Sequence, residues 1–368
     1  MGGQVTATRM RILGFTPFQI YPPHFGGAER CFNLLTRIPA DNVLGISWIG
    51  ESEQHTFGQT EYELIPIESE ALQKSKKLQA QGFQTYDAMP ELCRSEIRAL
   101  PARIEQLQPD LIVLEHPWLV GYIPKGIPYI YDAHNAEADS FGQRFGQRTP
   151  EHLNVRALEK RAIEGATLIT YCSETDVEIL RASYNVTADT MHIPNGVTLP
   201  DSATPTAERS QSKTLLFVGS VYQPNVDAAQ RLVNLAPLLR DWTIRIAGGC
   251  SYYVKSTWAN VELLGHVTDE KLHELHQEAY AFVNLVTEGS GTHLKIGRAL
   301  SYGIPVITTP IGARGYKTVM FTNGLNLNQV LGEIATHYDT LSAQGRTEAE
   351  ALSWDKIVEP LRKHVQVP

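Results

Sequence analysis

The sequence predicts an α/β protein built from two Rossmann-like, doubly wound parallel-sheet domains that face a cleft. Short β-branched runs alternate along the chain with longer runs of helical periodicity, as in βαβ units. The chain has 368 residues, more than one ordinary domain of roughly 150 residues would use. Between its halves, residues 198–213 lose apolar periodicity and are rich in Ser, Thr, Pro and charge, which is typical of an interdomain linker.

The first half of the chain carries the strands and helices of the first predicted domain, residues 1–197. We place its strands at residues 11–15, 43–49, 111–114, 129–131, 168–171 and 191–193. The clearest helical stretches between them read "AERCFNLLTRI", "ELCRSEIRALPARIEQL", "EHLNVRALEKRAIEGA" and "ETDVEILRASY".

After the linker the alternation resumes in a second predicted domain, residues 214–350. Its strands are expected at residues 215–218, 243–247, 261–264, 281–286 and 306–308, and its helices at "NVDAAQRLVNLAPLL", "DEKLHELHQEA" and "THLKIGRALSYG". The last segment, residues 351–368, has helical periodicity with an aromatic anchor at Trp354. We expect it to pack back on the first domain.

Charge and composition narrow the classes of partner. The formal net charge of −8 is spread along the chain without a basic block, which argues against a nucleic acid or an anionic membrane as the main partner. No run approaches the roughly 18 apolar residues of a membrane-spanning helix, and no apolar signal-peptide core follows the N-terminus. We therefore expect a cytoplasmic protein, with peripheral membrane contact left open.

The four cysteines give no sequence signal for a metal site or a disulfide framework. They lie far apart, without a Cys-x-x-Cys pair and without a His at ligand spacing, at positions 31, 93, 172 and 250. We expect four reduced thiols and no metal.

In the first domain, candidate binding residues follow three predicted strands. Gly26 and Gly27 precede a helix, so their backbone N–H groups are free for a ligand to approach; the alternative is a glycine turn that merely starts the helix. No G-x-G-x-x-G turn is present, which disfavours a dinucleotide-binding dehydrogenase. His116 and His134 each follow an apolar strand, and carboxyl ends of parallel strands are where such folds bind ligands.

In the second domain, two loops have the composition of a phosphate site. Gly219 and Ser220 stand at a strand end. The richer loop, "NLVTEGSGTHLK", places an acidic residue, a glycine turn and a lysine around a helix N-terminus, an arrangement that suits a diphosphate with attached hydroxyls. Its candidate residues are Glu288, Gly289, Ser290, Gly291, Thr292 and Lys295.

Six segments along the chain read, in order, "HFGGAER", "YDAHNAE", "IPNGVTLP", "LLFVGSVYQPNVDA", "VELLGHVTDEKLHELHQEAYAFV" and "GSGTHLKIGRALSYGIPVITTPIGARG". Together these segments resemble the retaining glycosyltransferases of the GT-B fold, the family of sucrose synthase and bacterial glycogen synthase. The resemblance covers nearly the whole chain.

Two features depart from the family pattern. In the family, two glutamates separated by seven residues contact the donor. Glu288 matches the first glutamate, but Ile296 or Arg298 occupies the second position, depending on the alignment. The cations that the family places after the strand ending in "FVGS" are missing from "VYQPN". We predict that Arg298 reaches back and contacts the donor nucleotide, with a solvated surface arginine as the alternative.

The resemblance implies transfer of a sugar from a nucleotide-sugar donor to an acceptor with retention of anomeric configuration. It implies no enzymic nucleophile, no metal and no cofactor, since the nucleotide sugar is a co-substrate. His116, Glu288 and Lys295 are then the catalytic candidates, with His116 near the donor sugar. The alternatives are a non-catalytic relative acting as partner or regulatory subunit, and a nucleotide-sugar epimerase or hydrolase.

Overall fold

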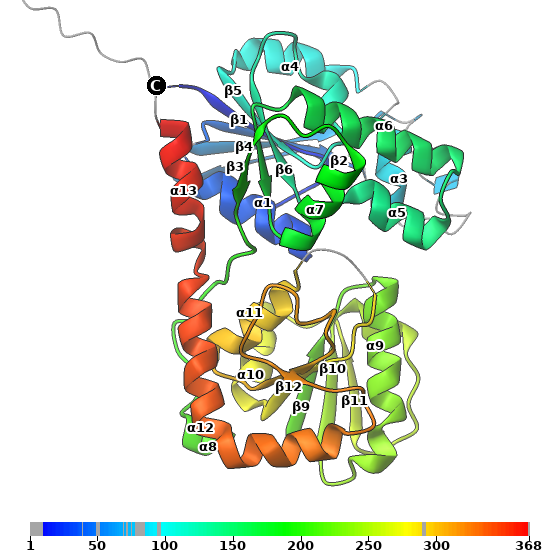
Figure 1. Ribbon diagram of the computed structural model, residues 1–368, viewed down its shortest axis with the longest axis vertical. Coiled ribbons are helices and arrows are strands. Elements are labelled where there is room, and N and C mark those ends of the chain that lie inside the picture. The colour runs from blue at the N-terminus through cyan, green and yellow to red at the C-terminus, as the bar shows by residue number, and fades with distance from the viewer. Residues whose placement is uncertain are drawn as a thin grey trace, which may run out of the picture. The chain divides into compact units, whose positions relative to one another are not determined.

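The computed structural model describes residues 10–38, 40–48, 52–68, 70, 73–74, 76–77, 85–93, 97–288 and 292–366. The chain forms two compact units, Met1–Ile193 with Val358–Pro368, and Pro194–Ile357. Each unit has its own sheet of mainly parallel strands (Figure 1). The predicted fold class, an α/β protein with two Rossmann-like domains, is confirmed.

Within its described residues, the first unit contains an eight-stranded sheet in the order β3-β4-β2-β1-β5-β6-β7-β8. All neighbouring strands are parallel except β3 and β4. The central strands β1, β5 and β6 are buried along their whole length, which explains their apolar character. The strands are β1 (Ile12–Thr16), β2 (Asn42–Ser47), β3 (Glu53–Phe57), β4 (Thr60–Pro66), β5 (Leu111–Glu115), β6 (Tyr129–Ala133), β7 (Leu168–Tyr171) and β8 (Asp189–His192).

The helices of the first unit connect these strands. The N-terminus of α5 is capped by Glu159, whose carboxylate accepts hydrogen bonds from the first two backbone N–H groups of α5 at 2.6 and 3.2 Å. The helices are α1 (Gly26–Arg37), α3 (Thr85–Leu92), α4 (Ala99–Leu107), η1 (Val120–Tyr122), α5 (Glu137–Phe145), α6 (Pro150–Gly165) and α7 (Glu174–Ser183).

The second unit contains a parallel sheet in the order β11-β10-β9-β12-β13-β14. Its strands are β9 (Thr214–Val218), β10 (Thr243–Ala247), β11 (Val261–Gly265), β12 (Ala281–Asn284), β13 (Val306–Thr308) and β14 (Met320–Phe321). The helices are α8 (Thr206–Arg209), α9 (Gln223–Asn234), η2 (Ala236–Leu238), η3 (Gly249–Tyr253), α10 (Asp269–Glu278), α11 (Leu294–Ser301), α12 (Leu327–Ala351) and the first turn of α13 (Trp354–Gln366). Right-handed crossovers place α9 and α11 on opposite faces of this sheet (Figure 1).

Each sheet has one point where the strand order reverses. In the first unit this point lies between β1 and β5, and in the second between β9 and β12. Loops that follow two such strands diverge to opposite faces and leave a crevice at the carboxyl ends, which is where open α/β sheets bind ligands. A ligand site is therefore expected in the loops that follow β1, β5, β9 and β12.

Three of the described strands were not predicted. β3 and β4 form a hairpin around Gly58, whose φ of 63° is left-handed and favours glycine. Tyr62 of β4 is 1% exposed and accepts a hydrogen bond from the backbone N–H of Ile20 at 3.2 Å. The short strand β14 at the opposite edge of the second sheet was also missed.

The segment predicted as a linker, residues 198–213, lies in the second unit and packs there. Arg209 of α8 is 1% exposed and donates to the backbone carbonyl of Gly303 at 3.0 Å. The division between the units falls at Ile193, earlier than the predicted boundary at residue 197. At the C-terminus, Arg362 of α13 donates to the backbone carbonyl of Arg37, the last residue of α1, at 2.9 Å.

None of the helices in the described part of the chain is long and apolar enough to cross a membrane.

Candidate active site

Lys295 places a partly buried positive charge at the switch point of the second unit. It occupies the first turn of α11, and its Nζ donates to Asn225 Oδ1 at 2.6 Å and lies 4.7 Å from the ring centroid of Phe217. Among the described residues no carboxylate forms an ion pair with it. Burial lowers the pKa of Lys295 to about 8. A partly buried ammonium without a counterion is suited to binding an anion.

Asn225 connects this ammonium to the loop after β9. Its Nδ2 donates to the backbone carbonyl and to Oγ of Ser220, at 3.3 and 3.2 Å. Lys295 therefore brings positive charge to the loop "VYQPN", which carries no cation of its own. The supply of this charge by Lys295 could not be predicted from residue spacing, because Lys295 and Asn225 are 70 residues apart.

Gly219 and Ser220 have different roles in the structure. A Cβ on Gly219 would lie 2.9 Å from Asn225 Cβ and 3.0 Å from Cys250 Sγ, so this glycine permits close packing beneath the loop. Gly219 is buried, whereas Ser220 is exposed. Of the pair, Ser220 is the residue that can meet a ligand.

Glu288 lies beyond β12, on the other side of the same switch point, and its side chain is exposed. Arg231 of α9 holds the chain just before it, donating to the hydroxyl of Thr287 and, at 3.3 Å, to the carbonyl of Leu285. Neither Arg231 nor Asn225 was among the residues predicted for the site. The predicted residues Gly289, Ser290 and Gly291 lie outside the described residues.

Thr292 and His293 lead into α11. Asn195 Nδ2 donates to the hydroxyl of Thr292 at 2.7 Å, so this threonine is held in place. His293 is the N-cap residue. Burial lowers its pKa to about 3, and the charges of Lys295 and Arg314 act in the same direction. The approach to α11 is thus a region of positive potential with a neutral imidazole.

Arg298 lies in the last turn of α11 and is partly buried. The buried face of α11 is formed by Ile296, Ala299 and Leu300, as expected, and the charge of Arg298 acts on the Tyr302 hydroxyl one turn further along the helix. The Tyr302 hydroxyl lies 2.6 Å from Nδ1 of His273 on α10. The contact of Arg298 with the donor nucleotide stays a prediction, with a role beside Tyr302 as the alternative.

In the first unit, Gly26 and Gly27 form the start of α1. The side chain of Phe25 lies against this turn, because a Cβ on Gly27 would be 3.0 Å from its ring. Phe18, in the loop after β1, packs edge-on against both Phe25 and the His116 ring, with centroid distances of 4.9 and 5.4 Å. The glycine loop and the residue after β5 therefore meet at the first switch point.

His116 is held tightly in this arrangement. Its φ is 61°, in the left-handed region, and its Nδ1 lies 2.9 Å from Glu137 Oε1 of α5. The residue is 1% exposed. Burial and the neighbouring His134 lower its pKa. His116 is thus buried against Phe18 and held by Glu137, and its contact with a donor sugar stays a prediction.

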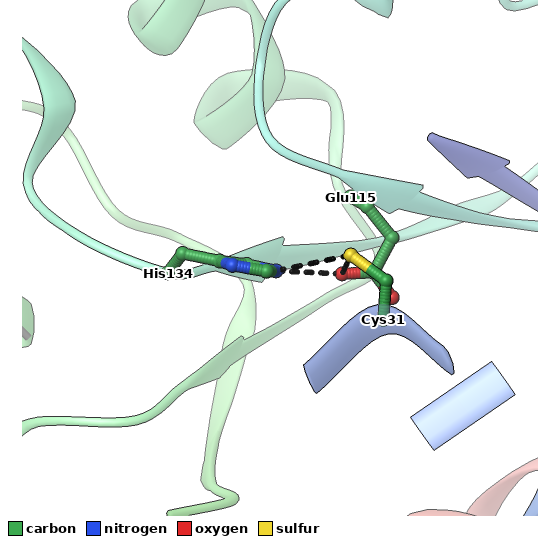
Figure 2. Close-up of side chains that lie close together, drawn as sticks. All are labelled: Cys31, Glu115 and His134. Atoms are coloured by element: carbon green, nitrogen blue, oxygen red, sulfur yellow. Dashed lines mark hydrogen bonds and ion pairs between the residues drawn. The ribbon is translucent and has the colours of Figure 1, made fainter. Parts of the chain in front are cut away.

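His134 comes beside His116, with ring centroids 3.9 Å apart, and joins a buried polar cluster. Its Nε2 lies 2.7 Å from Glu115 Oε2 and 3.8 Å from Cys31 Sγ (Figure 2). Asp132 Oδ2 is 3.2 Å from the same nitrogen. The sequence predicted His134 as a ligand-binding residue; the structure gives it buried protein partners.

Arg30 balances the charge of this cluster. Its Nε and Nη2 donate to the two carboxylate oxygens of Asp132 at 2.8 and 2.7 Å, and its Nη1 donates to the backbone carbonyl of Ile193. Burial opposes ionisation of Asp132, but Arg30 and His134 outweigh it and hold the pKa of Asp132 well below its usual range. Burial and the Asp132 charge raise the pKa of Glu115 well above its usual range.

Two doubly wound units, each with polar residues at its switch point, define the GT-B class. Residues 82–199 match the family model for Glycosyltransferase Family 4, and residues 212–332 match that for Glycosyl transferases group 1. The chain belongs to the GT-B glycosyltransferases, as the sequence predicted. A search of curated proteins found no significant match.

Solved structures share the fold across nearly the whole chain at low identity. Sucrose-phosphate synthase from Thermosynechococcus elongatus is 14% identical with a TM-score of 0.74, covering 96% of this chain and 98% of the other. HepE from Anabaena, in complex with UDP and glucose, is 15% identical with a TM-score of 0.69, covering 98% and 100%. The UDP-forming α,α-trehalose-phosphate synthase from Burkholderia xenovorans, in complex with glucose-6-phosphate, is 10% identical with a TM-score of 0.69, covering 97% and 100%.

Proposed function

We propose that this glycosyltransferase takes a sugar from a nucleotide-sugar donor and transfers it to an acceptor with retention of anomeric configuration. The observation that carries the proposal is Lys295. It places a partly buried positive charge, which no described carboxylate neutralises, at the carboxyl end of the second sheet. A diphosphate supplies the missing negative charge.

The residues around Lys295 suit such a ligand. The hydroxyl of Ser220 and the N-terminus of α11 offer hydrogen-bond donors to phosphate oxygens, and the helix dipole adds to the attraction. Glu288, exposed beyond β12, is available to accept hydrogen bonds from sugar hydroxyls. In this proposal Lys295 stabilises the leaving diphosphate and Glu288 orients the sugar.

The chemistry proposed here needs no enzymic nucleophile, metal or cofactor. As the donor bond breaks, negative charge grows on the departing phosphate, where Lys295 and the start of α11 stabilise it. The departing phosphate accepts the proton of the attacking acceptor hydroxyl, and the new bond forms on the same face of the sugar. His116 and Glu137 hold the first switch point in shape and do not react.

The ligands of structurally similar proteins indicate which substrates to test first. UDP and glucose occur with HepE, and glucose-6-phosphate occurs with the trehalose-phosphate synthase. We propose UDP-sugars first among donors and sugars or sugar phosphates first among acceptors. ADP-, GDP- and dTDP-sugars belong in the same panel, because nothing in the described site selects a base.

The test measures release of nucleoside diphosphate and formation of the glycoside with wild type, Glu288→Gln and the control Glu333→Gln, an exposed glutamate on α12. Loss of a charged hydrogen bond in a closed site costs about 2–3 kcal/mol, so Glu288→Gln should lower kcat/KM roughly 30- to 150-fold. NMR of the product should show the donor's anomeric configuration. Inversion, or equal rates for both variants, would contradict the proposal.

A non-catalytic relative is the second candidate. The observation that favours it is Arg298, which stands where one alignment places the family's second carboxylate and whose charge acts on the Tyr302 hydroxyl. Such a protein would bind a nucleotide sugar without turning it over. Tight donor binding with no glycoside formed from any acceptor in the panel would favour this candidate.

A further inference from the structure

The buried cluster beneath α1 brings together three side chains that are ordinary ligands of transition metals. Cys31 lies on α1, Glu115 ends β5, and His134 follows β6. All three are buried, at 0%, 0% and 7% exposure. Their ligand atoms lie within 4.8 Å of one another (Figure 2). The spacing along the chain does not predict this cluster, because 84 residues separate Cys31 from Glu115 and 19 separate Glu115 from His134.

The three ligand atoms have the right spacing to share one ion. Cys31 Sγ is 3.4 Å from Glu115 Oε2 and 3.8 Å from His134 Nε2, and the last two atoms are 2.7 Å apart. Three atoms at these separations lie on a circle of radius about 2.0 Å, so a point about 1 Å above their plane is about 2.2 Å from each. That distance is the one at which Zn²⁺ binds thiolate, imidazole and carboxylate.

The charges of the cluster also suit a divalent cation. A thiolate and a carboxylate together carry two negative charges, which one divalent ion neutralises. The nearby Asp132 carboxylate is already neutralised by its two hydrogen bonds from Arg30. The second carboxylate oxygen of Glu115, Oε1, has no hydrogen-bond partner in the described part of the chain. A buried oxygen of this kind is costly to leave unsatisfied, and binding of the ion through both carboxylate oxygens of Glu115 would give Oε1 a partner.

We propose that Cys31, Glu115 and His134 form a binding site for one transition-metal ion, with Zn²⁺ the best match to a sulfur, nitrogen and oxygen ligand set. The ion ties α1 to the ends of β5 and β6, and so fixes the glycine loop from which α1 begins. Its role is structural. The proposal does not depend on the proposed function, and the donor chemistry stays independent of the metal.

The test uses full-length protein with any affinity tag removed. Metal content after gel filtration, and the absorption spectrum on titration with Co²⁺, are measured for wild type, Cys31→Ser, His134→Gln and the control Cys93→Ser. Cys93 is a buried thiol outside the cluster. Wild type and the control should hold about one Zn²⁺ per chain and give the near-ultraviolet thiolate-to-Co²⁺ band with tetrahedral visible bands. Cys31→Ser should lose the thiolate band and bind at least about a hundredfold more weakly.

The spectrum of wild type decides the matter even if a variant fails to fold. Wild type that holds no metal after incubation with Zn²⁺ and gives no thiolate band with Co²⁺ would overturn the proposal. So would a Cys31→Ser protein that folds and binds as tightly as wild type, because the metal would then be bound elsewhere. Neither readout involves transfer activity, so failure here leaves the proposed function standing.

Discussion

Lys295 Nζ lies 2.6 Å from Asn225 Oδ1, and this bond joins the first turn of α11 to the first turn of α9, the helix that follows β9. The strands β9 and β12 are neighbours at the switch point of the second sheet. The ammonium therefore reaches the loop where the sequence shows no cation, "VYQPN". A binding role for Lys295 has consequences for stability, for pH dependence and for affinity that can be measured separately.

Lys295→Met should not lower the stability of the ligand-free protein. Among the described residues the ammonium has no carboxylate partner, so the fold gains little from its charge and loses by burying it. We expect the melting temperature to be unchanged or higher. The control is Lys271→Met on the exposed surface of α10, where Lys271 pairs with Glu274 and contributes little. A fall of many degrees for Lys295→Met would show that the lysine is structural.

Nucleotide affinity should fall at alkaline pH. Burial lowers the pKa of Lys295 from 10.5 to about 8, so the free protein loses this charge above pH 8. A nucleoside diphosphate favours the charged form, and its Kd should rise up to tenfold for each pH unit above about 8. Calorimetric titrations between pH 7 and 9.5 test this, and Lys295→Met should give a flat profile. A wild-type profile as flat as that of the variant would contradict the assignment.

The lowered pKa of Lys295 also makes the stability of the folded protein depend on pH, in the direction opposite to that of nucleotide affinity. Because the pKa is lower in the folded protein than in the unfolded chain, Lys295 opposes folding while it is protonated. That penalty is fully present below pH 8 and is lost as the pH rises from 8 toward 10.5. The difference in melting temperature between Lys295→Met and wild type should therefore shrink across this window.

Arg231 should act through Thr287 to position Glu288. Arg231→Met and Thr287→Val each remove the hydrogen bond between them. Each should lower kcat by about tenfold with little change in donor KM, and the double variant should resemble Arg231→Met, because Thr287→Val removes only the bond the two share while Arg231→Met also removes the bond to the Leu285 carbonyl. Additive losses would mean that the two residues act separately. If each variant lost thermal stability in proportion to its loss of kcat, Arg231 and Thr287 would act only in folding.

Arg298→Ala should leave the donor KM within about twofold of wild type. In the structure its charge acts on the Tyr302 hydroxyl, and so the substitution should show mainly as a modest fall in melting temperature. A donor KM raised tenfold or more, about 1.4 kcal/mol of binding, would show that Arg298 turns toward the nucleotide when the donor binds.

Much of the fold follows from the sequence because parallel strands are buried on both faces and read as apolar runs, as in β1 and β5. The β3–β4 hairpin was missed because the edge strand β3 reads EQHTF, which has one apolar residue in five. A signal was present in β4, where Tyr62 and Leu64 alternate with glutamates, and Gly58 supplies the turn. A period-of-two count there would have found it.

The site was only partly predictable, for a reason of topology. Strand ends are visible in the sequence, so Ser220, Glu288 and Lys295 could be selected as candidates. Which strand ends meet depends on the order of strands in the sheet, and a single sequence does not reveal that order. The bond from Lys295 to Asn225 and the cluster around His134 both join segments that only the folded sheets bring together.

The central claim is that Lys295 binds the diphosphate of a nucleotide donor. The most direct measurement titrates wild type and Lys295→Met with a nucleoside and its mono- and diphosphate at pH 7, beginning with uridine, UMP and UDP and extending to the other bases. Wild-type affinity should rise at least about tenfold, or 1.4 kcal/mol, from nucleoside to diphosphate, and Lys295→Met should lose most of that gain while binding the nucleoside equally well. Equal gains in both proteins, or no gain with any base, would contradict the account.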